Sequence, residues 1–156
     1  MQFKERKTIE QIEESSDFVP KFDENGLIPV ITTDIVSGEV LMQGFMNKDA
    51  LLETIQSGLA TYFSRSRQVI WKKGATSGLY QHVEEMRIDD DQDCIWLRVK
   101  VDGDASCHVG YRSCFYRSVP IQTNIAVDEL KLSFTENQKV FDPKDVYGDA
   151  PNPTII

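Results

Sequence analysis

CIWLRVKV, residues 94–101, is the stretch that decides the fold, because it gives the clearest strand signal in the chain. Four aspartates within five positions precede it in RIDDDQD, residues 87–93. After it, Asp102-Gly103-Asp104 turns the chain toward ASCHVGYRSCFYRSV. The other elements are therefore placed around this strand.

More strands are predicted on its N-terminal side. Residues 27–46 contain two β-rich runs on either side of a turn at Ser37-Gly38, which predicts an antiparallel hairpin. Residues 59–88 alternate apolar and charged side chains, with breaks at Lys73-Gly74 and Ser77-Gly78. This pattern predicts two more strands joined by a polar loop.

Helices are predicted to be few and short. NKDALLETIQSG, residues 47–58, offers Asn47 as N-cap, an apolar stripe, and Gly58 to end the helix in a left-handed conformation. Residues 5–15 suit a short amphipathic helix or a frayed arm. The expected fold class is α+β, a mostly antiparallel β-sheet with one or two short helices.

The chain is divided into an N-terminal arm (1–25), one folded domain (26–120) and a C-terminal extension (121–156). The extension is rich in Pro, Asp and Gly, so it is expected to be an extended tail or an arm laid on a neighbouring subunit.

Composition limits the possible functions. The chain has 156 residues, a net charge of −8 and a pI near 4.7, so its field opposes non-specific nucleic-acid binding. Its N-terminus lacks the apolar core of a signal peptide, and no apolar run approaches the ~18 residues of a membrane span. We expect a soluble cytoplasmic protein that binds neither nucleic acid nor membrane.

The acidic run has two interpretations. In an extended conformation, Asp89, Asp91 and Asp93 would share one face and Asp90 the other, so that two sites would share one strand. Oxygen ligands of this kind are what Mg²⁺ prefers. A solvated acidic turn is the alternative.

Two cysteines bracket a candidate zinc site. Cys107 and Cys114 enclose HVGYRS, where Gly110 can supply the turn that brings the two sulfurs together. Buried cysteines acting as small hydrophobes are the alternative. His108 is a candidate ligand, acid or base, or a hydrogen-bonded core histidine.

A basic stretch stands out in this acidic chain. SRSRQVIWKKG, residues 64–74, contains four basic residues and no acidic one. By itself it fits a phosphate-binding site and the solvent-exposed face of a strand about equally well, and the other motifs favour the phosphate site. Trp71 is a candidate for stacking on a base or for the core. The candidate substrate-binding residues are Ser64, Arg65, Ser66, Arg67, Trp71, Lys73, Gly74, Thr76 and Ser77.

In this order and spacing, GEVLMQGFMNKDALLETIQSG, SRSRQVIWKKGATSG, RIDDDQD and CHVGYRSCF closely resemble the phosphoribosyl-AMP cyclohydrolases of histidine biosynthesis. The resemblance covers residues 26–117 and implies an intertwined homodimer that uses Zn²⁺ and Mg²⁺. It implies hydrolysis of the N1–C6 bond of the adenine ring in 1-(5-phosphoribosyl)-AMP. It places magnesium on Asp89, Asp91 and Asp93, and zinc on Cys107 and Cys114.

One residue departs from the family's motif. The family reads Asp-Cys-Asp-x-Asp, with its cysteine as the third zinc ligand, often supplied across the dimer, whereas this chain has Asp90 there. Asp90 is a possible harder ligand. Cys94 is a poorer substitute, since it would lie roughly 13 Å further along an extended strand.

The resemblance also fixes expectations about mechanism and alternatives. His108 is the candidate proton carrier for hydroxide attack at C6 of the adenine ring. The chain is expected to be the monofunctional form, without a fused pyrophosphohydrolase domain. The alternatives are a related hydrolase acting on another purine nucleotide, and a non-catalytic nucleotide-binding paralogue.

Overall fold

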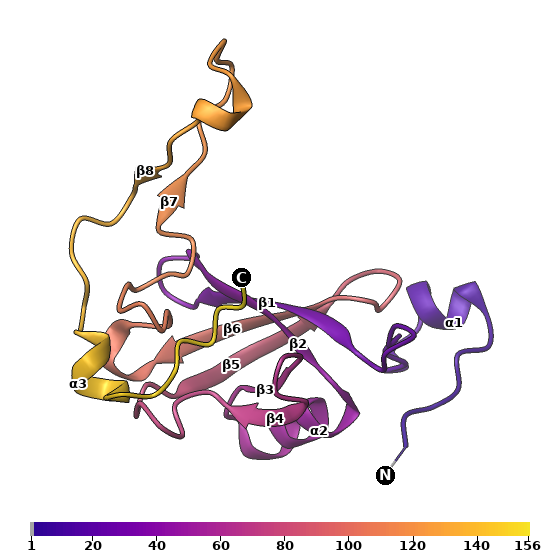
Figure 1. Cartoon of the computed structure of the whole chain (residues 1–156). Helices are drawn as coiled ribbons and strands as arrows, with labels where there is room; N and C mark the ends of the chain where they lie inside the picture. Colours follow the sequence, from indigo (N-terminus) through magenta and orange to yellow (C-terminus); the bar gives the residue numbers. More distant parts are fainter. Residues whose placement is uncertain (1) are drawn as a thin grey trace.

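A computed structural model describes residues 2–156, so of the predicted arm only Met1 lies outside it. The predicted α+β class is confirmed, with mostly antiparallel sheets and few short helices (Figure 1). In chain order the elements are α1 (Ile9–Glu14), β1 (Ile28–Asp34), β2 (Val40–Met46), α2 (Lys48–Ser57), β3 (Thr61–Ser64), β4 (Val69–Lys72), β5 (Gln81–Ile88), β6 (Ile95–Val101), the 3₁₀ turn η1 (Asp102–Asp104), β7 (Arg117–Ser118), the 3₁₀ turn η2 (Val127–Glu129), β8 (Ser133–Phe134) and α3 (Pro143–Tyr147).

The strand chosen from the sequence lies at the centre of the main sheet, whose order is β2-β1-β6-β5. β6 pairs parallel with β1 and antiparallel with β5, while β1 and β2 form the predicted antiparallel hairpin. Ile95, Leu97 and Val99 alternate along β6 and are fully buried on one face of the sheet, and the strands on each side pair with the backbone groups of β6.

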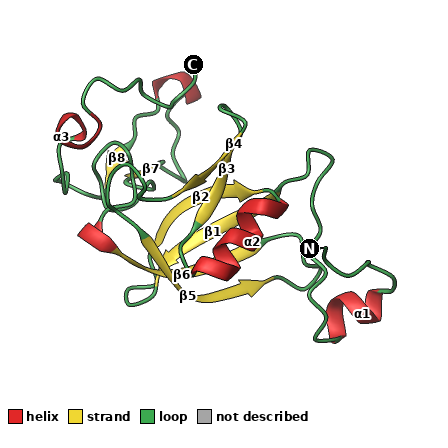
Figure 2. Ribbon diagram, turned by 90° about the horizontal axis from the view of Figure 1, so that it is seen from below, coloured by secondary structure: helices red, strands yellow, loops and turns green. Residues whose placement is uncertain are grey.

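Helix α2 forms where its caps predict it. The Asn47 side chain accepts from the Ala50 N–H at 2.9 Å, and Gly58 ends the helix at φ 70°. Ala50 and Leu51 are buried in the core, and Figure 2 shows α2 lying across one face of the sheet.

The prediction of two strands in residues 59–88 is wrong, because the structure has three. The basic residues 65–68 form a turn, and β3 and β4 pair antiparallel on either side of it as a separate two-stranded sheet. Gln68 adopts φ 55° in this turn, a left-handed conformation that a glutamine does not predict.

The predicted C-terminal extension, residues 121–156, falls in two structural parts, the first of which begins earlier, at residue 117. Residues 117–134 form a hairpin, closed by the pairing of β7 with β8, that projects away from the sheets (Figure 1). Residues 135–156, here called the C-terminal segment, return to the body of the molecule and include α3. No helix within residues 2–156 is long and apolar enough to span a membrane.

Candidate active site

The two cysteines lie in one tight loop, residues 105–114, here called the Cys loop. Gly110 reverses the chain at φ 105°, and its N–H donates to the carbonyl of Cys107 at 3.0 Å. The Cys114 N–H donates to the carbonyl of Leu41 at 2.7 Å, which fastens the loop to β2. The turn predicted at Gly110 is therefore present.

The two thiols interact within the Cys loop, since each shifts the pKa of the other. A hydrogen bond with Cys114 is the main cause that lowers the pKa of Cys107, to about 6. The same hydrogen bond raises the pKa of Cys114, so the second proton leaves far less readily than the first. Both cysteines are free, and a thiol that ionises easily is the form that zinc binds.

His108 lies at the tip of the Cys loop, and one of its ring nitrogens is buried. Its Nε2 is buried and has no hydrogen-bond partner in the part of the chain that the structure describes. Burial lowers the pKa of His108, and the nearby Lys73 ammonium lowers it further, whereas the Asn152 side chain acts in the opposite direction. Burial and the Lys73 charge therefore both favour the neutral imidazole.

The Lys73 side chain points into the protein interior. It is buried, and its Nζ donates to the carbonyl of Ser106 at 2.6 Å, directly beneath the Cys loop. Burial lowers the pKa of Lys73, and the thiols Cys114 and Cys107 oppose this shift. The position indicates electrostatic support of the thiol pair more than contact with a phosphate.

The basic turn, residues 64–67, is open to solvent apart from Ser64, which is half-buried. The guanidinium of Arg65 lies 4.2 Å from the centre of the Phe45 ring, and the Arg67 Nε donates to the Ser64 hydroxyl at 3.3 Å. Arg65, Ser66 and Arg67 thus present two guanidinium groups and a hydroxyl at one turn, a set suited to phosphate oxygens.

The remaining candidates on this side have different surroundings. Trp71 is half-buried, with its ring centre 5.7 Å from that of Tyr62. Gly74 is buried at φ 97°, and a Cβ there would come within 2.5 Å of the backbone of the loop that follows, so the position requires glycine. Thr76 is exposed and Ser77 half-buried, in the loop that leads to β5.

The aspartates lie in a turn between β5 and β6, residues 89–94, here called the acidic turn. The premise of an extended conformation is therefore wrong, and so is the alternation of faces that it implied. Asp89 Oδ1 accepts from the N–H groups of Asp93 at 2.9 Å and Cys94 at 3.0 Å. The turn also brings Cys94 opposite Asp89, because the Asp89 N–H donates to the carbonyl of Cys94. The separation of roughly 13 Å that an extended strand would give between Asp90 and Cys94 therefore does not apply.

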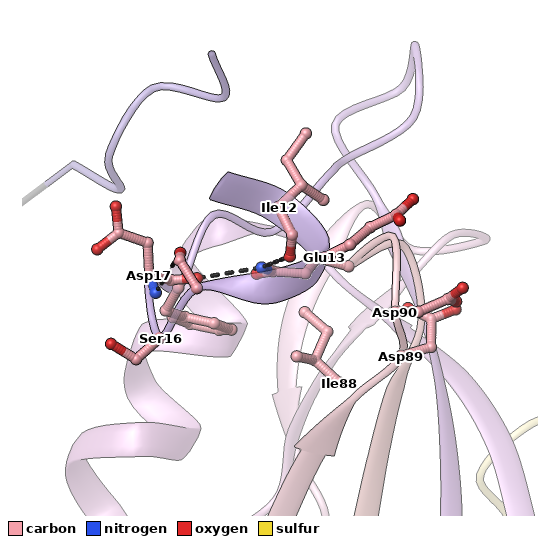
Figure 3. Close-up of a pocket in the computed structure, with 10 residues that line it drawn as sticks. Ile12, Glu13, Ser16, Asp17, Ile88, Asp89 and Asp90 are labelled. Carbon is pink, nitrogen blue, oxygen red and sulfur yellow. Dashed lines mark hydrogen bonds between the residues drawn. The ribbon is translucent and has the colours of Figure 1, made fainter. Parts of the chain in front are cut away.

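The acidic turn gathers carboxylates as a hard cation requires. Ligand oxygens of Asp89, Asp90 and Asp91 lie within 4.8 Å of one another, and Figure 3 shows Asp89 and Asp90 side by side. Asp93 lies next to them, since a hydrogen bond with Asp89 is the main cause that raises the pKa of Asp93. All four predicted aspartates therefore occupy this turn, with Asp90 among the others instead of on an opposite face.

Gln92 ties the N-terminal arm to the acidic turn. Its buried amide donates to the carbonyls of Ile12 at 2.9 Å and Asp17 at 3.1 Å. Its Oε1 accepts from the Val19 N–H at 2.8 Å. The N-terminal arm thus packs against the acidic turn and supports it. The sequence pattern did not predict this contact.

The acidic turn and the Cys loop lie at opposite ends of β6, since one precedes the strand and the other follows it. Asp90 therefore stands apart from Cys107 and Cys114 within one chain. On the Cys side the structure brings together the thiols, His108 and Lys73.

Several residues near the Cys loop were missed by sequence reasoning. Glu136 accepts from the backbone N–H groups of Arg112 at 2.9 Å and Ser113 at 3.0 Å. Pro153 and Ile155 line an open surface depression with the basic turn. These three residues belong to the C-terminal segment, where no motif or periodicity marked them.

Together, the small α+β fold, the thiol pair with the neighbouring imidazole and the exposed basic turn fit a hydrolase of phosphorylated substrates. The phosphoribosyl-AMP cyclohydrolase family model matches residues 42–116. A phosphoribosyl-AMP cyclohydrolase of Rhizobium leguminosarum bv. trifolii is 52% identical over 88% of this chain and 89% of its own length. Proteins of the same name from Rhodopseudomonas palustris (strain BisA53) and Agrobacterium fabrum are 50% and 48% identical, over 88% and 90% of this chain and 92% of each relative. The chain belongs to the phosphoribosyl-AMP cyclohydrolase family, and the resemblance found in the sequence is confirmed.

Proposed function

We propose that this chain opens the adenine ring of 1-(5-phosphoribosyl)-AMP by hydrolysis of the N1–C6 bond, as a step of histidine biosynthesis. The observation that carries the proposal is the Cys loop, where the thiols of Cys107 and Cys114 interact and the neighbouring His108 has a buried Nε2 without a hydrogen-bond partner among the described residues. The names of the relatives support the choice of substrate.

The reaction adds one water molecule across a single bond. The water oxygen bonds to C6, which keeps its exocyclic nitrogen and becomes a carboxamide carbon, while the C6–N1 bond breaks and N1 takes up a proton. His108 is placed to move this proton, because its Nε2 is enclosed and free of competing hydrogen bonds among the described residues. The guanidinium groups of Arg65 and Arg67 hold substrate phosphate.

The donor sets fit the two metals that we propose as cofactors. Cys107 and Cys114 supply two soft ligands for zinc, and Asp89, Asp91 and Asp93 supply hard oxygens for magnesium. When bound, zinc acts as a Lewis acid that lowers the pKa of a water molecule to ~7. Lys73 places a positive charge beneath the thiols and so favours their ionised form.

A homodimer with a shared site would supply the third zinc ligand. Within one chain Asp90 and the thiols lie beyond opposite ends of β6, so we propose that the acidic turn lies beside the Cys loop of the partner subunit. The projecting hairpin offers a surface for such pairing, since it exposes the apolar side chains of Val119, Ile121, Ile125, Val127, Leu132 and Phe134.

Ring opening of 1-(5-phosphoribosyl)-AMP, followed by absorbance with metal-analysed protein, tests the proposal. We expect turnover in the wild type and in Asp90→Cys, and its loss in Asp90→Ala. Absence of turnover in the wild type with added zinc would favour a hydrolase of another purine nucleotide, or a nucleotide-binding protein without catalysis.

A further inference from the structure

The C-terminal segment is fastened to the Cys loop of its own chain. The Glu136 carboxylate accepts two backbone N–H groups on one side of the loop, at 2.9 and 3.0 Å. On the other side, the Val140 N–H donates to the carbonyl of Gly110 at 2.7 Å. The segment is thus anchored at two points beside the proposed site.

This contact is too close for any side chain at Gly110. A Cβ there would lie 2.3 Å from the carbonyl oxygen of Phe141, and the φ of 105° already disfavours other residues. The Cys loop and the C-terminal segment are therefore fitted to each other backbone against backbone.

Beyond α3 the segment reaches the basic turn. Arg65, Ser66, Pro153 and Ile155 together line an open surface depression of about 500 Å³. A volume of this order suits a nucleotide-sized ligand. Asn152, next to Pro153, also lies near the His108 ring, so the same stretch of chain faces both the depression and the Cys loop.

The residues that line this depression are of two chemical kinds, polar and apolar. Arg65 and Ser66 offer a cationic fork and a hydroxyl, which suit phosphate oxygens. Pro153 and Ile155 offer apolar surface, and Ile155 is 75% exposed although it borders the depression, so it is not part of the core. A ligand with a phosphate at one end and a ring at the other matches both parts.

We propose that the C-terminal segment forms a wall of the substrate site, with Pro153 and Ile155 contacting the sugar or base of a purine nucleotide whose phosphate lies on Arg65 and Ser66. This inference rests on the proposed function for its substrate. It adds residues outside the range matched by the family model, 42–116, to the site.

Ile155→Ala in the full-length chain tests the wall, with Ile156→Ala as a matched control. The control removes the same side chain from the next residue, which is exposed and is not among the residues that line the depression. With 1-(5-phosphoribosyl)-AMP as substrate, Ile155→Ala should raise KM about three- to tenfold with kcat within about twofold. Ile156→Ala should leave both constants unchanged.

Calorimetric binding of AMP separates this inference from the proposed function. Weaker AMP binding by Ile155→Ala, with normal binding by Ile156→Ala, supports the wall even if the wild type shows no turnover. Equal effects of the two variants on KM and on AMP affinity overturn it, as does a wild type that binds no AMP.

Discussion

Asp90 and Cys107 stand at opposite ends of β6. The strand spans Ile95–Val101, and six rises of about 3.3 Å separate its ends by about 20 Å. Hydrogen bonds within each segment hold the acidic turn at one end of the strand and the Cys loop beyond the other. A site that uses both residues therefore requires two chains.

Mixing two inactive variants should restore activity if the site is shared between subunits. In a mixed dimer of Asp90→Ala and Cys107→Ser chains, one of the two sites has both residues intact. Random reassociation would then return about a quarter of the wild-type activity and zinc content. Each variant reassociated alone is the control, and a mixture no more active than these would show that the site lies within one chain.

The third zinc ligand should be visible in the cobalt-substituted protein. We expect Asp90→Ala to weaken cobalt and zinc binding by about tenfold or more, and Asp90→Cys to strengthen it and intensify the sulfur-to-cobalt absorption band. Cys94→Ala is the matched test of the alternative, because the acidic turn holds Cys94 opposite Asp89. Loss of the band intensity in Cys94→Ala alone would assign the ligand to Cys94 and contradict the role of Asp90.

Local sequence signals predicted the elements that depend on local physics. Asn47 and Gly58 fix α2 through backbone groups three or four residues away, and the buried alternation of β6 follows from period-two patterning. The turn at Gly110 was likewise predictable, because glycine readily adopts the positive φ of 105° found there.

What failed depended on turns and on distant contacts. Gln68 carries the reversal between β3 and β4 at positive φ, although glutamine gives no turn signal, and a third strand was therefore missed. The acidic run was predicted to be extended, but the Asp89 side chain accepts a hydrogen bond from the Asp93 N–H and closes a turn. Residue patterning does not encode such a bond between a side chain and the backbone. Glu136 meets Arg112 across 24 positions, a contact that no periodicity encodes.

Tyr62 should be essential to the stability of the core. Its buried hydroxyl donates to Gln81 Oε1 and shares a hydrogen bond with the Thr32 hydroxyl, each at 2.6 Å, so it joins β3 to β5 and β1. Tyr62→Phe leaves both partners short of a bond and should lower the free energy of unfolding by about 1–3 kcal/mol in denaturant titrations.

Tyr147→Phe is the control for this loss, since the structure records no hydrogen bond to that hydroxyl within residues 2–156. It should change the free energy of unfolding by less than about 0.5 kcal/mol. Equal effects of the two substitutions would mean that the network around Tyr62 adds nothing to stability.

Asp34 should make stability depend on pH in the acid range. Its Oδ1 accepts from the N–H groups of Ser37 at 2.8 Å and Val36 at 2.9 Å, and the bond from Ser37 is the main cause that lowers the pKa of Asp34. Because the pKa is lower in the folded state, the stabilisation is fully present above the unfolded value of about 3.9 and is lost as the pH falls through the folded value. Solvent screening limits it to about 0.5 kcal/mol. Denaturant titrations of wild type and Asp34→Asn should therefore differ at pH 7 and converge as the pH falls below about 4. Ser37→Ala removes only the smaller side-chain contribution of Ser37 and keeps its backbone donor, so it should retain most of the pH dependence of the wild type. A difference that stays constant down to pH 3 would show that the charge on Asp34 does not hold the β1–β2 turn.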